Sequence, residues 1–222
     1  MRKMLLSICF LFFFFFIGEK GMAQADPATY LTDVKAELNK KWPDNRTINL
    51  VFHGHSVPTG YANTPYVQRP QSYPFLTLIK LQKRYPYSVA NTITTSLGGE
   101  NSAQGEKRFK KDVFIHKPDV LFIDYALNDR RIGLEKTKQA TEKMIRMALR
   151  KHIKVILVTP SPDLKVDITT SGNILEQYTN QLIALAKKYD IGLANSYAAF
   201  VNLAKSGENL HNYMAQYNHP NE

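Results

Sequence analysis

The sequence predicts an α/β protein in which five parallel strands form one sheet and helices cover both of its faces. Short apolar runs of strand length alternate with helical patterns from one end of the chain to the other. Such alternation is typical of βαβ units, whose crossover helices pack on the sheet. Residues 26–222 have a length that suits one domain with a full core, and no internal repeat or linker divides them.

The first 25 residues have the pattern of a secretory signal peptide and are expected to lie outside the fold. Arg2 and Lys3 precede an apolar run over Met4–Ile17, and Ala23-Gln24-Ala25 fits a cleavage site before Asp26. The run is shorter than the about 20 apolar residues that a membrane span needs. A secreted or periplasmic protein without stable membrane insertion is therefore expected.

The elements of the domain follow from apolar periodicity in chain order. An N-terminal helix has Tyr30, Leu31, Val34 and Leu38 on one face and Pro27 in its first turn. The apolar, β-rich runs that predict strands are Ile48–Phe52, Tyr87–Ile93, Val120–Tyr125, Val155–Thr159 and Ile191–Asn195. The stretches whose apolar spacing predicts the remaining helices are Pro74–Tyr85, Ala103–Ile115, Leu134–Lys151 and Asn173–Tyr189.

The charge pattern argues against a nucleic-acid partner. The formal net charge is +10, and removing residues 1–25 takes away three basic residues and one acidic residue, which leaves +8. The basic residues are scattered, and their densest group, residues 107–111, lacks the series of stacking aromatics that a nucleic-acid groove needs. The only cysteine, Cys9, lies in the signal peptide, so the mature chain has no disulfide to form.

A serine that follows the first strand is the strongest candidate for chemistry. The run Val51-Phe52-His53-Gly54-His55-Ser56 ends an apolar strand, and Gly54 is expected to let the backbone bend before the next helix. A serine on such a turn presents its hydroxyl at the sheet edge where α/β proteins bind ligands. It becomes a nucleophile where a base takes its proton and donors stabilise the oxyanion that it creates.

Three further blocks follow later strands and are expected at the same edge. Gly98-Gly99 comes after the second strand, Asn128-Asp129 after the third, and His219-Pro220-Asn221 after the fifth. A backbone N–H and a side-chain amide suit an oxyanion and the histidine suits a base, although each block alone also fits a turn, a helix cap or a surface histidine. The long polar loops 57–72 and 161–172 also follow strand ends and are expected to form walls of the cleft.

In their order, the blocks Gly54-His55-Ser56, Gly99, Asn128-Asp129 and His219-Pro220-Asn221 resemble those of the SGNH/GDSL esterase and lipase family, over a span from Ile48 to the end. The resemblance implies a flavodoxin-like, three-layer α/β/α sandwich that needs no cofactor. It also implies that Ser56 is the nucleophile and first oxyanion donor, that Gly99 and Asn128 are the other donors, and that His219 is the general base. Family members deacylate esters, and secreted bacterial ones often remove acetyl groups from plant or host glycans.

Three positions depart from the family pattern. His55 replaces the aspartate of Gly-Asp-Ser and Ala126 replaces a glycine, and neither change removes a reacting group. The family's acid lies three residues before the histidine, where this chain has Gln216. Three groups are candidates to orient His219 instead: the Gln216 amide, the Asp163 carboxylate in the loop after the fourth strand, or a backbone carbonyl. The choice matters, because replacing the acid by its amide in one well-studied triad cost about ten-thousandfold in rate.

The end of the chain and a pair of histidines carry two further expectations. In the family a helix usually follows the His-Pro-Asn block, whereas this sequence stops at Glu222. We therefore expect either a C-terminally truncated fragment or a base, His219, that is loosely held. His53 and His55 flank Gly54, but the turn expected there separates them and no acid or cysteine completes a ligand spacing, so no metal is expected.

These features together predict a secreted carboxylic ester hydrolase that removes short acyl groups, above all O-acetyl groups on carbohydrate, by a Ser56–His219 mechanism. Its expected partner is a small-molecule or glycan ester, and the sequence sets no oligomeric state. Two alternatives stay open. One is a carbohydrate-binding protein on the same scaffold whose catalysis has decayed, given Gln216. The other is an acyltransferase, in which a sugar hydroxyl takes the place of water.

Overall fold

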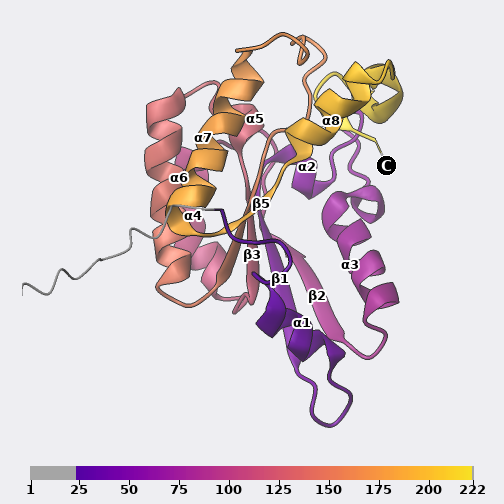
Figure 1. Ribbon diagram of the computed structural model, residues 1–222, viewed down its shortest axis with the longest axis vertical. Helices are drawn as coiled ribbons and strands as arrows, with labels where there is room; N and C mark the ends of the chain where they lie inside the picture. Colours follow the sequence, from indigo (N-terminus) through magenta and orange to yellow (C-terminus); the bar gives the residue numbers. More distant parts are fainter. Residues whose placement is uncertain (1–23, 222) are drawn as a thin grey trace, which may run out of the picture.

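A computed structural model describes residues 24–221 of the chain (Figure 1). The predicted signal peptide, residues 1–25, lies outside the described residues except for its last two. Within residues 24–221, no helix has both the length and the apolar composition that crossing a membrane requires.

The central sheet has five parallel strands in the order β2-β1-β3-β4-β5. The strand bounds are β1 Thr47–Gly54, β2 Val89–Thr94, β3 Val120–Asp124, β4 Lys154–Val158 and β5 Gly192–Ala194. This is the order of flavodoxin-like sheets, which bind ligands where the strand order reverses, here between β1 and β3. The predicted fold class and all five predicted strands are confirmed, with small differences at the strand ends.

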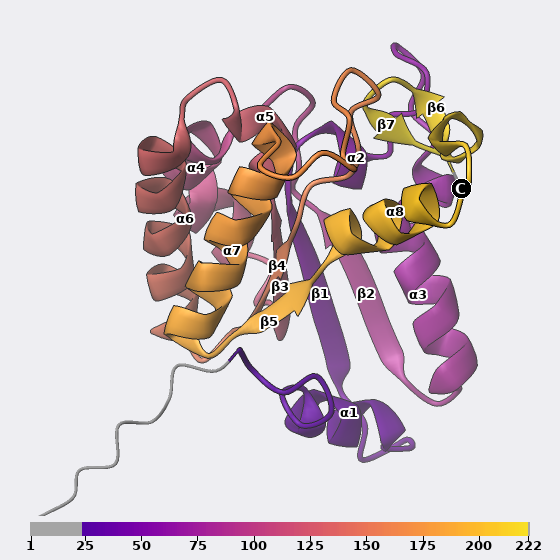
Figure 2. The same ribbon diagram turned by 45° about the horizontal axis from the view of Figure 1, so that its top comes forward.

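Helices cover both faces of the sheet and give three layers (Figures 1 and 2). Helices α4, α6 and α7 pack on one face, and α1 and α3 pack on the other. The helix bounds are α1 Thr32–Asn39, α2 Ser56–Thr59, α3 Tyr73–Arg84, α4 Ser102–Phe114, α5 Ala126–Asp129, α6 Leu134–Leu149, α7 Ile174–Tyr189 and α8 Ser196–Lys205. Two 3-10 turns cover Arg69–Gln71 and Leu210–Tyr213.

Side-chain alternation along β1 builds both halves of the core. Ile48, Leu50 and Phe52 pack in one cluster with α1 and α3, whereas Val51 belongs to the cluster on the opposite face with α4, α6 and α7. Successive strand residues point to opposite faces, so a strand with apolar side chains on both of its sides is buried on both faces. Burying each such side chain contributes about 1.5–3 kcal/mol. This packing fixes the C-terminal end of β1, where the predicted nucleophile follows.

Two element boundaries differ from the expectations. Strand β1 does not end at Phe52 but continues through Gly54, and the chain turns at His55, which has φ −106° and ψ −148°. The N-terminal helix begins at Thr32 and not near Pro27. The Asp26 carboxylate accepts hydrogen bonds from the Ala28 N–H at 2.9 Å and from a nearby threonine hydroxyl at 3.1 Å, which stabilises turns ahead of the helix.

An antiparallel hairpin, β6 Met214–Gln216 and β7 His219–Pro220, lies beside α2 at the C-terminal edge of the main sheet (Figure 2). The sequence did not predict this hairpin or helix α8. Strands of two and three residues are too short to show a periodic pattern. The hairpin nevertheless decides where the predicted base lies.

Candidate active site

Ser56 begins α2 directly after β1, at the C-terminal edge of the sheet. His55 is the N-cap residue of this helix, and its carbonyl accepts a hydrogen bond of 2.7 Å from the Thr59 hydroxyl. Gly60 ends the helix with a φ of +96°, a left-handed conformation that favours glycine. These contacts fix one turn of helix, and Ser56 is 7% exposed on it.

Gly54 is required by the close approach of β1 and β3. A Cβ at this position would overlap the main-chain oxygen of Asp124 and crowd the ring of Pro58. The same Asp124 oxygen accepts a hydrogen bond of 3.2 Å from the His55 N–H. The glycine therefore lets the turn lie directly against β3. The interpretation of Gly54 as the point where the strand bends was wrong.

His219 lies within hydrogen-bonding distance of Ser56. Its Nε2 is 2.8 Å from Ser56 Oγ, and its Nδ1 is 2.9 Å from the main-chain oxygen of Ala62. A carbonyl oxygen only accepts, so Nδ1 carries the proton and Nε2 accepts from the serine hydroxyl. Burial lowers the pKa of His219, against the opposing effect of the Ala62 bond, and nearby His55 lowers it further. The imidazole is therefore neutral at pH 7, the form that a general base needs.

The β6–β7 hairpin holds His219 in place. The Leu164 N–H donates a hydrogen bond of 2.7 Å to the Tyr217 oxygen in the hairpin turn, and the Asn221 N–H donates one of 3.0 Å to the Tyr213 oxygen. The His219 side chain is 4% exposed. The expectation of a loosely held base is therefore wrong, because the last strand is tied to two neighbouring segments.

The group that orients the base is a backbone carbonyl, one of the three candidates from the sequence. Gln216 Oε1 accepts a hydrogen bond of 2.9 Å from the Thr64 N–H, and Asp163 forms an ion pair of 2.7 Å with Arg130. Thr64 lies in the turn that begins at Ala62. The Ala62 N–H closes this turn with a hydrogen bond of 3.1 Å to the Tyr66 oxygen. Gln216 thus supports the turn that presents the Ala62 oxygen, and the orienting group carries no charge.

The other two predicted oxyanion donors follow the strands on either side of β1. Gly99 has a φ of +78°, and an added Cβ would meet no atom within 4 Å, so backbone conformation requires glycine here. The Leu97 N–H donates a bond of 3.0 Å to the Gly54 oxygen and ties this loop to β1. Asn128, in α5, donates one amide hydrogen to the Glu100 oxygen at 3.0 Å. Its second amide hydrogen is the candidate oxyanion donor.

Glu100, which the sequence interpretation missed, joins the two donor loops. Its carboxylate accepts a hydrogen bond of 2.7 Å from Arg108 Nε and one of 2.9 Å from the Tyr125 hydroxyl. Burial and the Glu100 charge raise the pKa of Tyr125, so the hydroxyl stays protonated and donates. The main-chain oxygen of Glu100 holds Asn128. Arg108, Tyr125 and Asn128 are distant from Glu100 in sequence. The only signal in the sequence is that an acidic residue directly follows Gly98-Gly99.

His53 has a structural place in the core. Its Nε2–H donates to the Gly105 oxygen at 3.2 Å, its Nδ1 accepts from the Thr95 hydroxyl at 2.8 Å, and its ring packs edge-on against Phe109 and Tyr125. Among residues 24–221, no group of three or more histidine, cysteine or acidic side chains is arranged to hold a metal ion.

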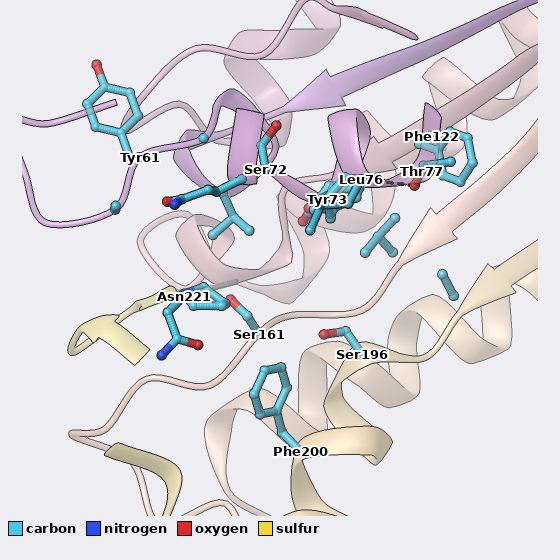
Figure 3. A pocket seen from close by; sticks show the side chains of 18 of the residues that line it. Tyr61, Ser72, Tyr73, Leu76, Thr77, Phe122, Ser161, Ser196, Phe200 and Asn221 are labelled. Atoms are coloured by element: carbon cyan, nitrogen blue, oxygen red, sulfur yellow. Dashed lines mark hydrogen bonds between the residues drawn. The ribbon is translucent and has the colours of Figure 1, made fainter. Parts of the chain in front are cut away.

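A cavity of about 760 Å³ lies beside the serine, between α3 and α8 (Figure 3). Val57, which follows Ser56, and Pro220, which follows His219, line the cavity together with Asp124. The lining residues labelled in Figure 3 are Tyr61, Ser72, Tyr73, Leu76, Thr77, Phe122, Ser161, Ser196, Phe200 and Asn221. Its volume is in the range of small-molecule sites. Both predicted cleft loops contribute, loop 161–172 through Ser161.

Comparison with known sequences identifies one family. A model of the GDSL-like Lipase/Acylhydrolase family matches residues 52–222. The uncharacterized lipoprotein YqeF of Bacillus subtilis (strain 168) is 30% identical over 122 residues, which are 51% of this chain and 49% of that protein. The chain thus spans about half the length of the curated relative that it matches.

Solved esterase structures share the fold. A two-domain esterase (CEX) active on acetylated mannans superimposes with a TM-score of 0.71 at 17% identity, over 90% of this chain and 50% of that chain. Axe2, an acetylxylan esterase from Geobacillus stearothermophilus, gives a TM-score of 0.66 at 17% identity, over 78% of this chain and 86% of that chain. Catalytic mutants of Axe2 replace a serine, an aspartate and a histidine. At these identities the similarity establishes the three-layer fold.

Proposed function

Because this chain belongs to the GDSL-like Lipase/Acylhydrolase family, whose members are carboxylic ester hydrolases, we propose that it is a secreted serine esterase that removes short acyl groups, chiefly O-acetyl groups, from carbohydrate. The observation that carries the proposal is the pair of hydrogen bonds that links Ser56 to His219 and His219 to the Ala62 oxygen. A serine hydroxyl held by a neutral, oriented imidazole is the arrangement that nucleophilic catalysis needs.

The proposed reaction proceeds through an acyl-enzyme. Ser56 Oγ attacks the ester carbonyl carbon as its proton passes to His219 Nε2, and the carbonyl electron pair moves onto oxygen. The N–H groups of Ser56 and Gly99 and the Asn128 amide stabilise this oxyanion. His219 then gives its proton to the departing alcohol as the C–O bond breaks. Water repeats the sequence and releases the acid.

The substrate class and the location rest on analogy. Esterases of the same fold act on acetylated mannans and on acetylxylan, which supports an acetylated glycan as substrate. The predicted signal peptide and the lipoprotein relative both support export. The cavity beside the site has room for part of a substrate.

An ester panel on the mature chain tests the proposal. Wild type and Ser56→Ala are assayed with 4-nitrophenyl acetate, acetylated xylan and acetylated mannan. Wild type should release acetate, and Ser56→Ala should lose at least about a thousandfold in kcat. Full activity in Ser56→Ala contradicts the serine mechanism. Glycan binding without turnover supports the carbohydrate-binding alternative, and acetyl transfer to an added sugar supports the acyltransferase.

A further inference from the structure

A second imidazole lies next to the Ser56 hydroxyl. His55 Nδ1 is 3.4 Å from Ser56 Oγ, and the Val57 N–H donates to the same nitrogen at 3.3 Å. Because Nδ1 accepts from a main-chain N–H, it carries a lone pair and the proton of the neutral ring lies on Nε2. His55 is 1% exposed, so water does not compete for this nitrogen.

A carboxylate lies behind this second imidazole. His55 Nε2 is 3.2 Å from Asp124 Oδ1, an approach that is close in distance but too bent to form a hydrogen bond. The other oxygen, Asp124 Oδ2, accepts a hydrogen bond of 3.0 Å from the Tyr73 hydroxyl. Asp124 is 4% exposed, and its attraction for a positive imidazole is screened little at such a site. The order Tyr73–Asp124–His55–Ser56 repeats the acid–histidine–serine order of a triad.

We propose that His55, backed by Asp124, is a second base for the Ser56 hydroxyl, an inference that rests on the esterase activity proposed above. In this step the Val57 N–H gives up its hydrogen bond to His55 Nδ1, the Ser56 O–H bond breaks, and the proton passes to the Nδ1 lone pair that is freed. The Oγ electron pair forms the bond to the acyl carbon, and the carbonyl pair moves onto oxygen. His55 becomes an imidazolium beside the Asp124 carboxylate, and later returns the proton to the departing alcohol.

The two imidazoles differ in their distance from Ser56 Oγ and in the group that lies behind each ring. His219 is closer to Ser56 Oγ, at 2.8 Å against 3.4 Å, and holds the hydroxyl in the resting site. His219 is backed by a neutral carbonyl, whereas His55 is backed by a carboxylate that stabilises the imidazolium. In a full triad, replacing the carboxylate by its amide costs about ten-thousandfold. The charged or titratable groups that face His55 are Asp124, Asp129 and His219.

The test compares His219→Ala, His55→Asn and the double variant. Asparagine is a good N-cap, so His55→Asn keeps an acceptor for the Val57 N–H and removes only the imidazole. General-base catalysis is worth about a hundred- to ten-thousandfold. We expect His219→Ala to lose about a hundredfold in kcat/KM and the double variant a further tenfold or more.

Asp124→Asn in the His219→Ala background provides a second route, because it removes the charge with almost no change in shape. It should also lower the residual rate. His152→Asn, at an exposed turn before β4, is the matched control and should leave kcat/KM unchanged. Equal rates for His219→Ala and the double variant, or a His219→Ala rate no higher than that of Ser56→Ala, overturn the proposal. An inactive wild type would refute the esterase function itself, and the inference would fall with it.

Discussion

At the scale of single residues, a main-chain oxygen takes over part of the role that a carboxylate has in a full triad. The Ala62 oxygen fixes the tautomer of His219, so Nε2 faces Ser56 with its lone pair. In the proposed mechanism it adds no charge to stabilise the imidazolium that would form on His219 when the serine loses its proton. The Ala62 oxygen therefore supplies orientation to His219, and the Asp124 carboxylate lies on the His55 side of the serine.

Gln216→Ala should lower kcat/KM by about tenfold, below the full value of general-base catalysis. The change removes the acceptor for the Thr64 N–H and loosens the turn that carries Ala62. Gln216→Glu should stay near wild type, because a carboxylate oxygen still accepts that bond. Asp163→Asn removes a carboxylate that pairs with Arg130 and does not contact His219, so in an acetyl-ester assay it should lower kcat/KM less than Gln216→Ala does. Its free energy of unfolding is measured alongside, because Asp163 belongs to a buried ion pair. A silent Gln216→Ala beside an inactive Asp163→Asn would contradict this account.

Asn128→Ala should lower kcat by about a hundredfold or more with little change in KM. An oxyanion donor acts more strongly on the transition state than on the bound ester, so its loss appears in kcat. Steady-state kinetics with 4-nitrophenyl acetate would measure both constants. A loss confined to KM would instead assign the Asn128 amide to ground-state binding.

At the scale of elements, long periodic segments could be predicted from the sequence and short irregular ones could not. Helices such as Ile174–Tyr189 repeat an apolar face over several turns, and that pattern marks them before any tertiary contact is known. The β6–β7 hairpin has two or three residues per strand and depends on partners from distant loops. The order of the motifs and their resemblance to a family predict the serine, the oxyanion donors and the histidine. They do not predict the Ala62 oxygen, because a backbone acceptor has no residue signature.

Glu100→Gln should destabilise the fold by about 3 kcal/mol and also lower kcat. Removing one partner of a buried ion pair leaves the other charge uncompensated. The Glu100 loop carries Gly99 and holds Asn128, so a loosened loop misplaces both donors. Thermal unfolding and kcat are measured together. Asp112→Asn, which removes the more exposed partner of Arg108, is the control and should leave kcat unchanged. If Glu100→Gln is destabilised but its kcat is unaltered, the Glu100–Arg108 ion pair does not position the proposed oxyanion donors.

At the scale of the whole molecule, the sheet gathers residues from distant parts of the chain at one edge. Parallel strands β2, β1 and β3 are neighbours, so the loops that follow them place Gly99, Ser56 and Asn128 side by side in order. The same close packing buries titratable groups just beneath the site. His53 and Asp129 are both buried, and their pKa values move in opposite directions. The free energy of unfolding therefore depends on pH through His53 and Asp129, whose contributions oppose each other.

The last prediction concerns this pH dependence. Burial lowers the pKa of His53 from 6.5 to about 4, so the unfolded chain takes up this proton first and stability is lost as pH falls from 6.5 to about 4. Burial raises the pKa of Asp129 from 3.8 to about 6, so the folded chain takes up that proton first. Its contribution to stability is present below pH 3.8 and is lost as pH rises to about 6.

Over the shared range from about pH 4 to 6 the two contributions largely cancel in the wild type, since each is on the order of 3 kcal/mol. Asp129→Asn keeps an acceptor for the Ser102 N–H and removes the pH-dependent contribution of the Asp129 carboxyl. Its free energy of unfolding, measured with urea at a series of pH values, should fall more steeply on acidification than that of the wild type. Parallel curves for the two proteins would show that the Asp129 carboxyl does not titrate in this range. A flatter curve for the variant would mean that the fold lowers the pKa of Asp129, the opposite of the direction given above.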